Sequence, residues 1–211
     1  AQHHAGGDGD VGGVVDEDPS NLVNEIMVVD NGSTDRTGAL AAAAGARVVH
    51  EPARGYGAAC LAGALAAADA DIIVFLDGDR NEDPRELPRV LAPVLAGQAD
   101  LVIGSRTRGG TAPGALTLQQ RVGNRVVTVL LRLLYGLSLT DIGPFRAIPT
   151  RVLRVLAMEL KTYGWPVEMI VKAARHGARI VELPVSYRPR LAGRSKVGGT
   201  IRGTVLATYR I

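Results

Sequence analysis

Two aspartates lie one residue apart at the end of an apolar run, in the stretch VFLDGDRNEDP from Val74 to Pro84. Asp77 and Asp79 would repel each other if they were held close, which raises a pKa or requires a cation nearby. Carboxylate oxygens suit Mg²⁺ or Mn²⁺, and such an ion usually takes substrate phosphate oxygens as further ligands. The triplet therefore predicts a divalent metal and a phosphate-bearing ligand, and a polar surface turn is the alternative.

A third acidic residue, Asp30, follows the apolar stretch EIMVV. Downstream, the segments NGSTDRTGALAAAAGA and GYGAACLAGALAAADA are typical of a turn followed by a helix, and Gly45 is placed to end the first helix. RVVH and DIIVFLD are typical of strands, and DIIVFLD is apolar on both faces, as a central parallel strand should be. This alternation predicts an α/β fold with a mostly parallel sheet flanked by helices. Ligands gather at the carboxyl ends of such strands, so we expect Asp30, Asp77 and Asp79 on one rim.

Chain length and composition favour one domain. The chain has 211 residues, 46% of them apolar, which is enough for a substantial core. Residues 1–25 are rich in Gly and Asp and lack a strand or helix period, so we expect an irregular segment followed by a single domain over 26–211. Lys and Arg total 24 against 21 Asp and Glu, and a net charge of +3 demands no polyanionic partner. Arginine nevertheless dominates from Arg106 onward, which indicates that the C-terminal half meets anions.

The sequence also indicates a compartment. A single cysteine, Cys60, excludes an internal disulfide framework, and no signal peptide opens the chain, so we expect a cytoplasmic protein. No apolar run reaches the roughly 18 residues that span a bilayer, so any membrane contact would be peripheral, at the inner face. Aromatic residues make up 4% of the chain and are not interleaved with the basic ones, which argues against nucleic-acid binding.

One long segment has two interpretations. TLQQRVGNRVVTVLLRLLYG predicts a helix that is apolar over most of its surface and is interrupted by Arg121, Arg125 and Arg132. Burial of this helix in the core is favoured. A face that lies against anionic lipid is the alternative.

Several motifs, in order and in register, resemble a known family. They are VVDNGSTDRT, EPARGYGAACLAG, VFLDGD, DLVIGSR, DIGPFRAI and VELPVSYRPRLAGRSKVGGT. From about Glu25 to Ile211 the chain looks like the family 2 glycosyltransferases of GT-A fold, and in particular like the dolichyl- or polyprenyl-phosphate sugar synthase branch. The resemblance implies a metal-dependent, inverting transfer of a sugar from a nucleotide-diphosphate sugar to an acceptor, with polyprenyl phosphate favoured.

The resemblance also implies roles for individual residues. Asp79 would ligate the Mg²⁺ or Mn²⁺ that bridges the diphosphate, and Asp77 would face the ribose or the metal, so both count as catalytic. Asn31 stands where the family has a second Asp. The residues implied to bind the nucleotide sugar are Asp30, Asn31, Arg54, Gly55, Gly57 and Asp77.

The acceptor side depends on the chemistry of the nucleophile. A hydroxyl acceptor needs a general base, and Glu168 in YGWPVEM is the candidate. A phosphate acceptor is already an anion and needs cations to hold it, which the basic stretch SYRPRLAGRSKVGG supplies. The residues predicted on the acceptor and phosphate side are Ser105, Arg106, Arg188, Arg190, Arg194, Ser195 and Lys196.

Three alternatives stay open at this point. The acceptor could be a soluble hydroxyl compound, which a lack of lipid dependence would reveal. The chain could be a non-catalytic nucleotide-sugar-binding relative, because residues 1–25 do not match the apolar first strand, ending in P-x-x-N-E, with which the family begins. A sugar-phosphate nucleotidyltransferase is disfavoured, since its Gly-rich opening strand and loop have no match here either. The sugar, the base of the donor and the oligomeric state are not determined by the sequence.

Overall fold

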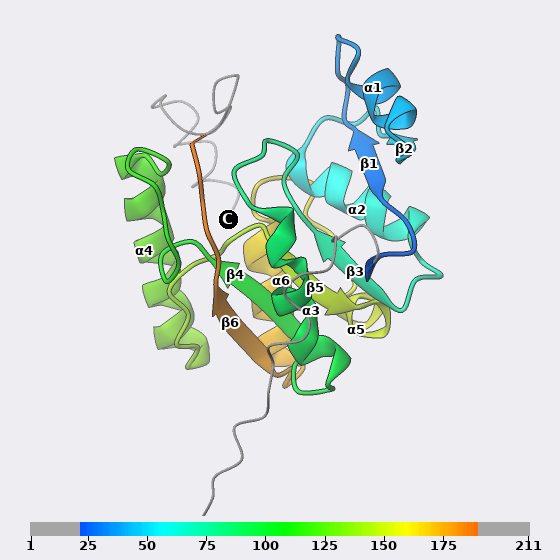
Figure 1. Ribbon diagram of the computed structural model, residues 1–211. Coiled ribbons are helices and arrows are strands. Elements are labelled where there is room, and N and C mark those ends of the chain that lie inside the picture. The colour runs from blue at the N-terminus through cyan, green and yellow to red at the C-terminus, as the bar shows by residue number, and fades with distance from the viewer. Residues whose placement is uncertain (1–21, 190–211) are drawn as a thin grey trace, which may run out of the picture.

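A computed structural model describes residues 22–189 of the chain (Figure 1). The elements alternate between strand and helix as far as β3, and a short 3₁₀ helix, η2, precedes α3. In chain order they are β1 Met27–Asp30, α1 Thr37–Ala43, β2 Arg47–His50, α2 Tyr56–Ala66, β3 Ile72–Phe75, η2 Pro84–Glu86, α3 Leu87–Leu95, β4 Leu101–Ser105, α4 Leu118–Tyr135, β5 Arg146–Pro149, α5 Thr150–Leu156, α6 Trp165–Arg175 and β6 Ile180–Pro184.

Two sheets are formed by the described strands. β1 and β2 make a parallel pair, and the other four strands are ordered β3-β5-β4-β6. β5 is antiparallel to both of its neighbours and β4 is parallel to β6, so β3, β4 and β6 share one direction. The mixed α/β fold and its mainly parallel strands confirm the predicted fold class. The central position predicted for β3 is wrong, because β3 lies at an edge of the four-stranded sheet and pairs with the antiparallel β5.

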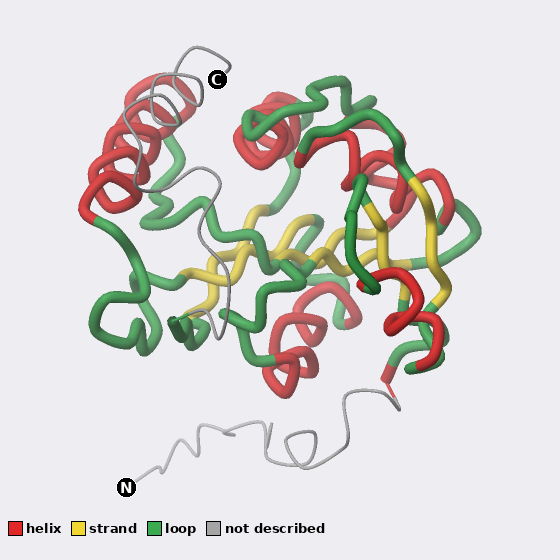
Figure 2. Tube along the Cα trace, turned by 90° about the horizontal axis from the view of Figure 1, so that it is seen from above, coloured by secondary structure: helices red, strands yellow, loops and turns green. Residues whose placement is uncertain are grey.

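Helices cover both faces of the four-stranded sheet, as the view from above shows (Figure 2). Alternation along β4 explains the two layers of core: Leu101 and Ile103 join the cluster with α5 and α6, whereas Val102 joins the cluster with α3. All five residues of β4 are buried. The sheet is therefore packed on both faces, and the loops that leave its strands start from buried positions.

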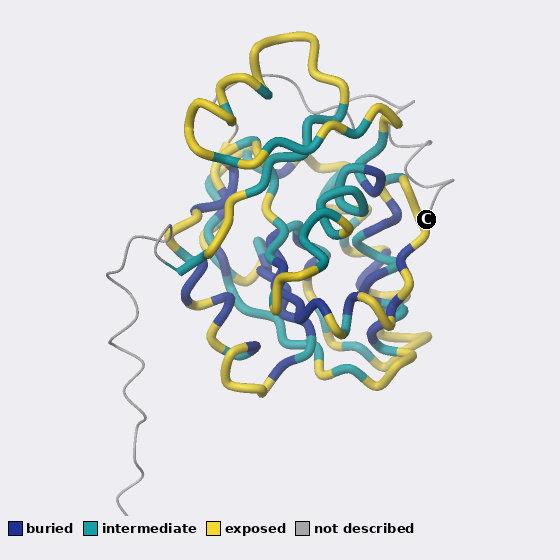
Figure 3. The backbone as a smooth tube through the Cα atoms, turned by 90° about the vertical axis from the view of Figure 1, so that its right-hand side faces the viewer, coloured by how far each residue is buried: buried dark blue, intermediate teal, exposed yellow. Residues whose placement is uncertain are grey.

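The β1–α1–β2 unit is packed more loosely than the rest. It lies at the upper right of Figure 1, and in Figure 3 the top of the molecule is coloured teal and yellow while dark blue gathers below. No residue of α1 is buried, and every residue of β1 is only partly buried. As predicted, α1 ends near Gly45, which adopts the left-handed φ of +87°. No described strand joins β1 to β3, so the expected single rim carrying both Asp30 and Asp77 is not formed by these strands.

Helix α4 differs most from its expected environment. A capping box formed by Thr117 and Gln120 starts it, and Gly136, with a φ of +68°, ends it. Its buried residues are Val127, Thr128 and Leu131. The favoured interpretation, a helix buried in the core, is therefore wrong, because most of the helix surface is exposed. Among the described residues, no helix is both long and apolar enough to cross a membrane.

Candidate functional site

The acidic turn after β3 is held by its own backbone and by one amide side chain. Asp79 accepts hydrogen bonds through Oδ1 from the Asn81 backbone N–H, at 3.2 Å, and through Oδ2 from Asn81 Nδ2, at 3.0 Å. Between them Arg80 has a φ of +61°, an unusual conformation for a residue with a Cβ, of the kind that clusters at functional sites. The turn therefore has one defined shape and presents Asp79 together with Asn81.

Asp77 lies beside the start of α2. Burial raises the pKa of the Cys60 thiol to about 12, and the negative charge of Asp77 contributes to that rise. The pKa of the partly buried Tyr56 hydroxyl is also raised, first by desolvation and then by Asp77. Arg146, whose charge acts in the opposite direction on both groups, lies near the same cluster, so Asp77 and Arg146 flank Tyr56 and Cys60 with opposite charges.

Asn81 connects the acidic turn to the basic C-terminal stretch. Its Nδ2 also donates to the Tyr187 hydroxyl at 2.6 Å, and its carbonyl accepts from the Arg188 backbone N–H at 2.8 Å. The guanidinium carbon of Arg106 lies 5.2 Å from the centre of the Tyr187 ring, within cation-π range. Asn81 and Tyr187 therefore connect Asp79, which was predicted to hold the metal, with Arg106 and Arg188, which were predicted to bind the acceptor.

Two further acids follow Asn81 and behave in opposite ways. Glu82 is buried, and burial together with Asp77 and Asp79 raises its pKa to about 8. Asp83 instead forms ion pairs with Arg85 and Arg188, and its hydrogen bonds with Arg85 lower its pKa to about 2. Glu82 is thus mainly protonated at neutral pH, whereas Asp83 stays charged and holds Arg188 near the acidic turn.

The oxygen atoms at this turn fit a divalent cation. Asn81 Oδ1 and both carboxyl oxygens of Glu82 are buried and lack a hydrogen-bond partner within the described part of the chain. A buried acceptor without a donor is unfavourable, and a cation beside Asn81 Oδ1 would remove that cost and would also favour the ionised form of Glu82. Within residues 22–189 no group of three or more His, Cys, Asp or Glu side chains is arranged to hold a metal.

Asp30 and Asn31 organise the loop between β1 and α1 and the loop after β2. Asp30 accepts a 2.9 Å hydrogen bond from the Ser33 N–H, and hydrogen bonding with the Ser33 side chain, followed by this N–H bond, lowers the pKa of Asp30. Asn31 uses its whole amide: Nδ2 donates to the carbonyls of Glu51 and Ala53, and Oδ1 accepts from the Gly55 N–H at 2.8 Å. A carboxylate could not donate to these two carbonyls, so an aspartate at this position could not make the same contacts.

Arg54, Gly55 and Gly57 follow in that same loop. Arg54 is exposed and lies over Gly32, whose φ of +77° forms the facing turn. A Cβ on Gly55 would lie 2.2 Å from the Lys161 carbonyl oxygen, and one on Gly57 would lie 2.1 Å from that of Leu160. Glycine is therefore required because the protein's own 160–161 backbone approaches so closely, a contact that the sequence did not predict.

Glu168 binds the backbone segment that approaches Gly55 and Gly57. Its carboxylate accepts from the backbone N–H groups of Glu159 and Leu160, both at 2.9 Å, and pairs with Lys172 at 2.8 Å. Burial alone would raise its pKa, but the hydrogen bonds from Lys172 and the two N–H groups outweigh burial and lower it. A carboxylate with a lowered pKa is a weaker base, so this arrangement favours a supporting role for Glu168.

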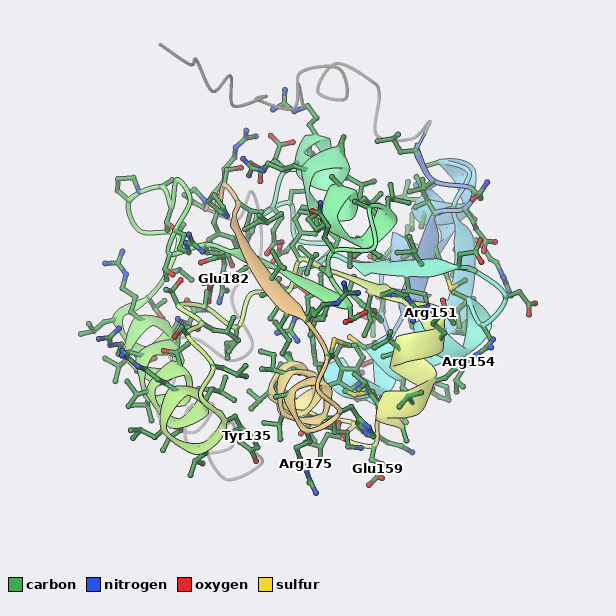
Figure 4. The ribbon with its side chains drawn as sticks, turned by 90° about the horizontal axis from the view of Figure 1, so that it is seen from below. Tyr135, Arg151, Arg154, Glu159, Arg175 and Glu182 are labelled. Atoms are coloured by element: carbon green, nitrogen blue, oxygen red, sulfur yellow. The ribbon has the colours of Figure 1, made fainter. Side chains whose placement is uncertain are left out.

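On the acceptor side, Arg106 is fixed by a two-pronged ion pair. Its Nε and Nη2 donate to the two oxygens of the fully buried Asp141, each at 2.8 Å. Glu182, labelled on the α4 side of β6 in Figure 4, accepts from the Asp141 N–H at 2.8 Å and holds that loop. Ser105 is fully buried, and its hydroxyl contacts those of Thr107 and Thr140.

The predicted site residues thus fall into three groups. The acidic turn lies with Arg106 and Arg188, and Asn31, Arg54, Gly55 and Gly57 form a loop near Glu168's segment. Asp30 belongs to the two-stranded sheet. Arg190, Arg194, Ser195 and Lys196 lie outside the described residues.

The sequence interpretation missed Asn81, Tyr187 and Glu182. Two of these had a signal, since Asn81 stands two residues after Asp79 and Tyr187 precedes the first arginine of the basic stretch.

Comparison with solved structures defines the class of protein. Glucosyl-3-phosphoglycerate synthase of Mycobacterium tuberculosis, solved with phosphoglyceric acid, is similar with a TM-score of 0.68 at 24% identity, over 89% of this chain and 67% of that one. The same synthase solved with Mn²⁺, UDP-glucose and phosphoglyceric acid gives a TM-score of 0.63 at 29% identity, over 83% of this chain and 62% of that one. The fold is therefore that of the GT-A-like sugar transferases.

The family follows from sequence. The pattern of the family described as "Glycosyl transferase family 2" matches residues 14–157, and the chain belongs to this family. An uncharacterised glycosyltransferase of Mycobacterium tuberculosis is 43% identical over 86% of this chain and 81% of its own length. An undecaprenyl-phosphate mannosyltransferase of Micrococcus luteus is 35% identical over 85% of this chain and 78% of its own length. A polyprenol monophosphomannose synthase of Mycolicibacterium smegmatis is 34% identical over 83% of this chain and 71% of its own length. The chain is a glycosyltransferase.

Proposed function

We propose that this glycosyltransferase moves a sugar from a nucleotide-diphosphate sugar to a polyprenyl phosphate, with inversion at the anomeric carbon. Support comes from two relatives named for polyprenyl-phosphate mannosyl transfer, each of which matches more than four fifths of the chain. The observation that carries the choice of acceptor is the state of Glu168. Its carboxylate is engaged by two N–H groups and Lys172, which leaves it poorly suited to deprotonate a hydroxyl acceptor.

The proposed roles follow from the chain's own contacts. Asp79, with the Oδ1 of Asn81 beside it, would hold Mg²⁺ or Mn²⁺, which when bound supplies positive charge for the departing diphosphate. Asn31 holds the Arg54–Gly55 loop so that Arg54 can meet the nucleotide. Arg106, fixed by Asp141, would orient the acceptor phosphate, which attacks without first losing a proton to the protein.

A second candidate has its own support. The solved synthase at 29% identity contains phosphoglyceric acid, a soluble anion, together with UDP-glucose and Mn²⁺. The same arginines could hold a small phosphorylated acceptor, since guanidinium groups recognise phosphate by geometry and charge.

Calorimetric titration tests the donor site first. UDP and GDP are titrated with Mn²⁺, Mg²⁺ or EDTA into the wild type and into Asp79→Asn, and Arg151→Gln, an exposed change on α5, serves as the control. We expect metal-dependent binding of one nucleotide, weakened about tenfold or more in Asp79→Asn. Absence of binding to either nucleotide by the wild type would instead favour a relative without a working donor pocket.

Sugar transfer is then measured with radiolabelled donor. The acceptors are polyprenyl phosphate in detergent, the dephosphorylated polyprenol, and phosphoglyceric acid. Product with polyprenyl phosphate alone supports the proposal. Product with phosphoglyceric acid alone would favour the soluble acceptor, and product with the polyprenol would mean that a hydroxyl is the nucleophile.

A further inference from the structure

Helix α4 is attached to the molecule along one narrow side. Val127, Thr128 and Leu131 are buried, and the neighbouring contacts are with α6. In Figure 1 the helix lies at the left edge of the molecule, apart from the helices that cover the sheet. With 18 residues it is the longest helix of the described part, yet the rest of its circumference is open to solvent.

The open side is apolar. Leu118, Val122, Val126, Val129 and Leu133 recur at spacings of four, four, three and four residues, which places them on one face of the helix. Leu130 and Leu134 widen this face. The seven side chains are between 40% and 77% exposed. We call them the α4 outer face. A contiguous row of exposed large apolar side chains marks a surface that meets another apolar phase or partner.

The charges beside this face have one sign. Arg121, Arg125 and Arg132 lie along one flank of the helix, between the α4 outer face and the buried side, and residues 118–135 contain no Asp or Glu. An apolar face with arginines along its edge is what a helix lying in the headgroup region of an anionic bilayer requires. A second copy would bring the same row of positive charge toward the first, which disfavours a symmetric pairing through this face.

The helix is also connected to the candidate site. The Asn124 side chain donates to the Thr140 carbonyl at 2.9 Å and accepts from the Ile142 N–H at 3.0 Å. These bonds hold the segment that carries Asp141, the partner of Arg106. Asn124 is on the buried side of α4, so a surface that bound the α4 outer face would lie across the width of this one helix, about 10 Å, from the segment that positions the residues proposed to hold the acceptor phosphate.

We propose that the α4 outer face, with its three flanking arginines, binds the surface of an anionic lipid membrane. The apolar side chains enter the headgroup and upper acyl region, and the arginines meet lipid phosphates at its edge. The inference extends the proposed function, because a lipid-bound acceptor would be reached from this surface, but vesicle binding tests it without any turnover.

Co-sedimentation with vesicles is the experiment, using the full chain. Vesicles are made of phosphatidylcholine alone or with added phosphatidylglycerol. We expect the wild type to bind the anionic vesicles, with binding that weakens as salt is added. The triple change Leu118→Ser, Val122→Ser, Leu133→Ser should lower the partition coefficient at least about tenfold. The triple change Arg121→Gln, Arg125→Gln, Arg132→Gln should lower it by a similar factor.

Matched variants exclude general effects of hydrophobicity and charge. Leu40→Ser, Leu65→Ser, Leu95→Ser removes three equally exposed leucines from other helices, and Arg36→Gln, Arg151→Gln, Arg175→Gln removes three exposed charges elsewhere. Neither control should change vesicle binding more than about twofold. Calorimetric donor binding should be unchanged in both α4 variants, since none of the altered residues contacts the acidic turn.

Several outcomes would overturn the inference. These are equal binding by the wild type and the α4 variants, equal loss in the control variants, or no binding by the wild type. A dimer in light scattering that the serine variant converts to a monomer would show that a second copy covers the face. The proposed function fails separately, if the protein binds vesicles through α4 but transfers no sugar to polyprenyl phosphate.

Discussion

At the scale of single residues, the candidate site depends on neutral side chains that orient charged ones. Asn81 shares its two amide hydrogens between Asp79 and Tyr187, which directs Oδ1 away from both. The aspartates were predictable, because acids that follow an apolar strand are visible in sequence. The role of Asn81 was not, since it depends on Tyr187, which is 106 residues away in the chain.

Removing the Tyr187 hydroxyl should weaken metal binding without unfolding the protein. In Tyr187→Phe, Asn81 Nδ2 loses one acceptor and its amide can rotate. We expect Mn²⁺-dependent nucleotide affinity to fall about tenfold, while the free energy of unfolding changes by about 1 kcal/mol. Calorimetry and urea unfolding measure the two effects. Tyr163→Phe, at an exposed tyrosine, is the control and should alter neither; equal metal affinity in both variants would show that Tyr187 does not orient Asn81.

Glu82 should make the metal-free protein less stable at high pH. Its pKa of about 8 in the folded protein exceeds the usual value of 4.5, so between these pH values the folded state holds a proton that the unfolded state has lost. Stability contributed by that proton is fully present below the lower value and is lost as pH rises through the upper one.

Glu82→Gln should therefore flatten the pH dependence of unfolding. In EDTA, the wild type is expected to lose up to about 1.4 kcal/mol of unfolding free energy per pH unit between pH 5 and pH 8 from this group. The isosteric glutamine variant should lose less, and its advantage should grow with pH. Urea unfolding at a series of pH values measures the slope, and parallel curves for the two proteins would contradict the assignment.

At the scale of elements, periodicity predicted which segments form helices but not which faces are covered. α1, α2 and α4 formed where the Ala-rich and Leu-rich patterns indicated. The environment of α4 was mistaken, because apolar residues around most of a helix indicate burial only when neighbours exist to cover them. β5 was not predicted to lie antiparallel between β3 and β4, since RAIP carries no signal of direction or partner.

The contact between α2's first turn and the 160–161 segment can be tested with a pair of glycines. A Cβ at position 57 would meet the Leu160 carbonyl oxygen, whereas Gly123 in α4 has nothing within 4 Å of its Cβ position. Gly57→Ala should destabilise the fold by about 2 kcal/mol or more and weaken donor binding, because the Arg54–Gly55 loop must shift. Gly123→Ala should stabilise by about 0.5–1 kcal/mol. Urea unfolding measures the change in the free energy of unfolding for both variants. A similar small change at both positions would mean that the 160–161 backbone moves to make room for the Cβ at position 57.

At the scale of the whole molecule, the protein has a well-packed part and a less buried part. The four-stranded sheet has two hydrophobic clusters on its faces, whereas β1–α1–β2 contains no buried residue. The acidic turn follows β3 of the first part, Asp30 and Asn31 belong to the second, and the Arg54–Gly55 loop between them contacts the 160–161 backbone. A nucleotide held between a metal at Asp79 and the Arg54 loop would join the two.

Hydrogen exchange measured by mass spectrometry tests this division. Segments with few buried apolar contacts open at lower free energy than the core, so amides of residues 27–50 should exchange far faster than those of β4 and β6. Addition of the nucleotide identified by calorimetry, with Mn²⁺, should slow exchange in 27–50 much more than in the sheet, because ligand bound to both parts removes their independent opening. Asp79→Asn provides the control, since it leaves β1 and β2 intact but should lose this protection at the same nucleotide concentration. Exchange in 27–50 as slow as in β4 before ligand is added would mean that the unit is already joined to the main sheet, and protection retained by Asp79→Asn would place the nucleotide away from the acidic turn.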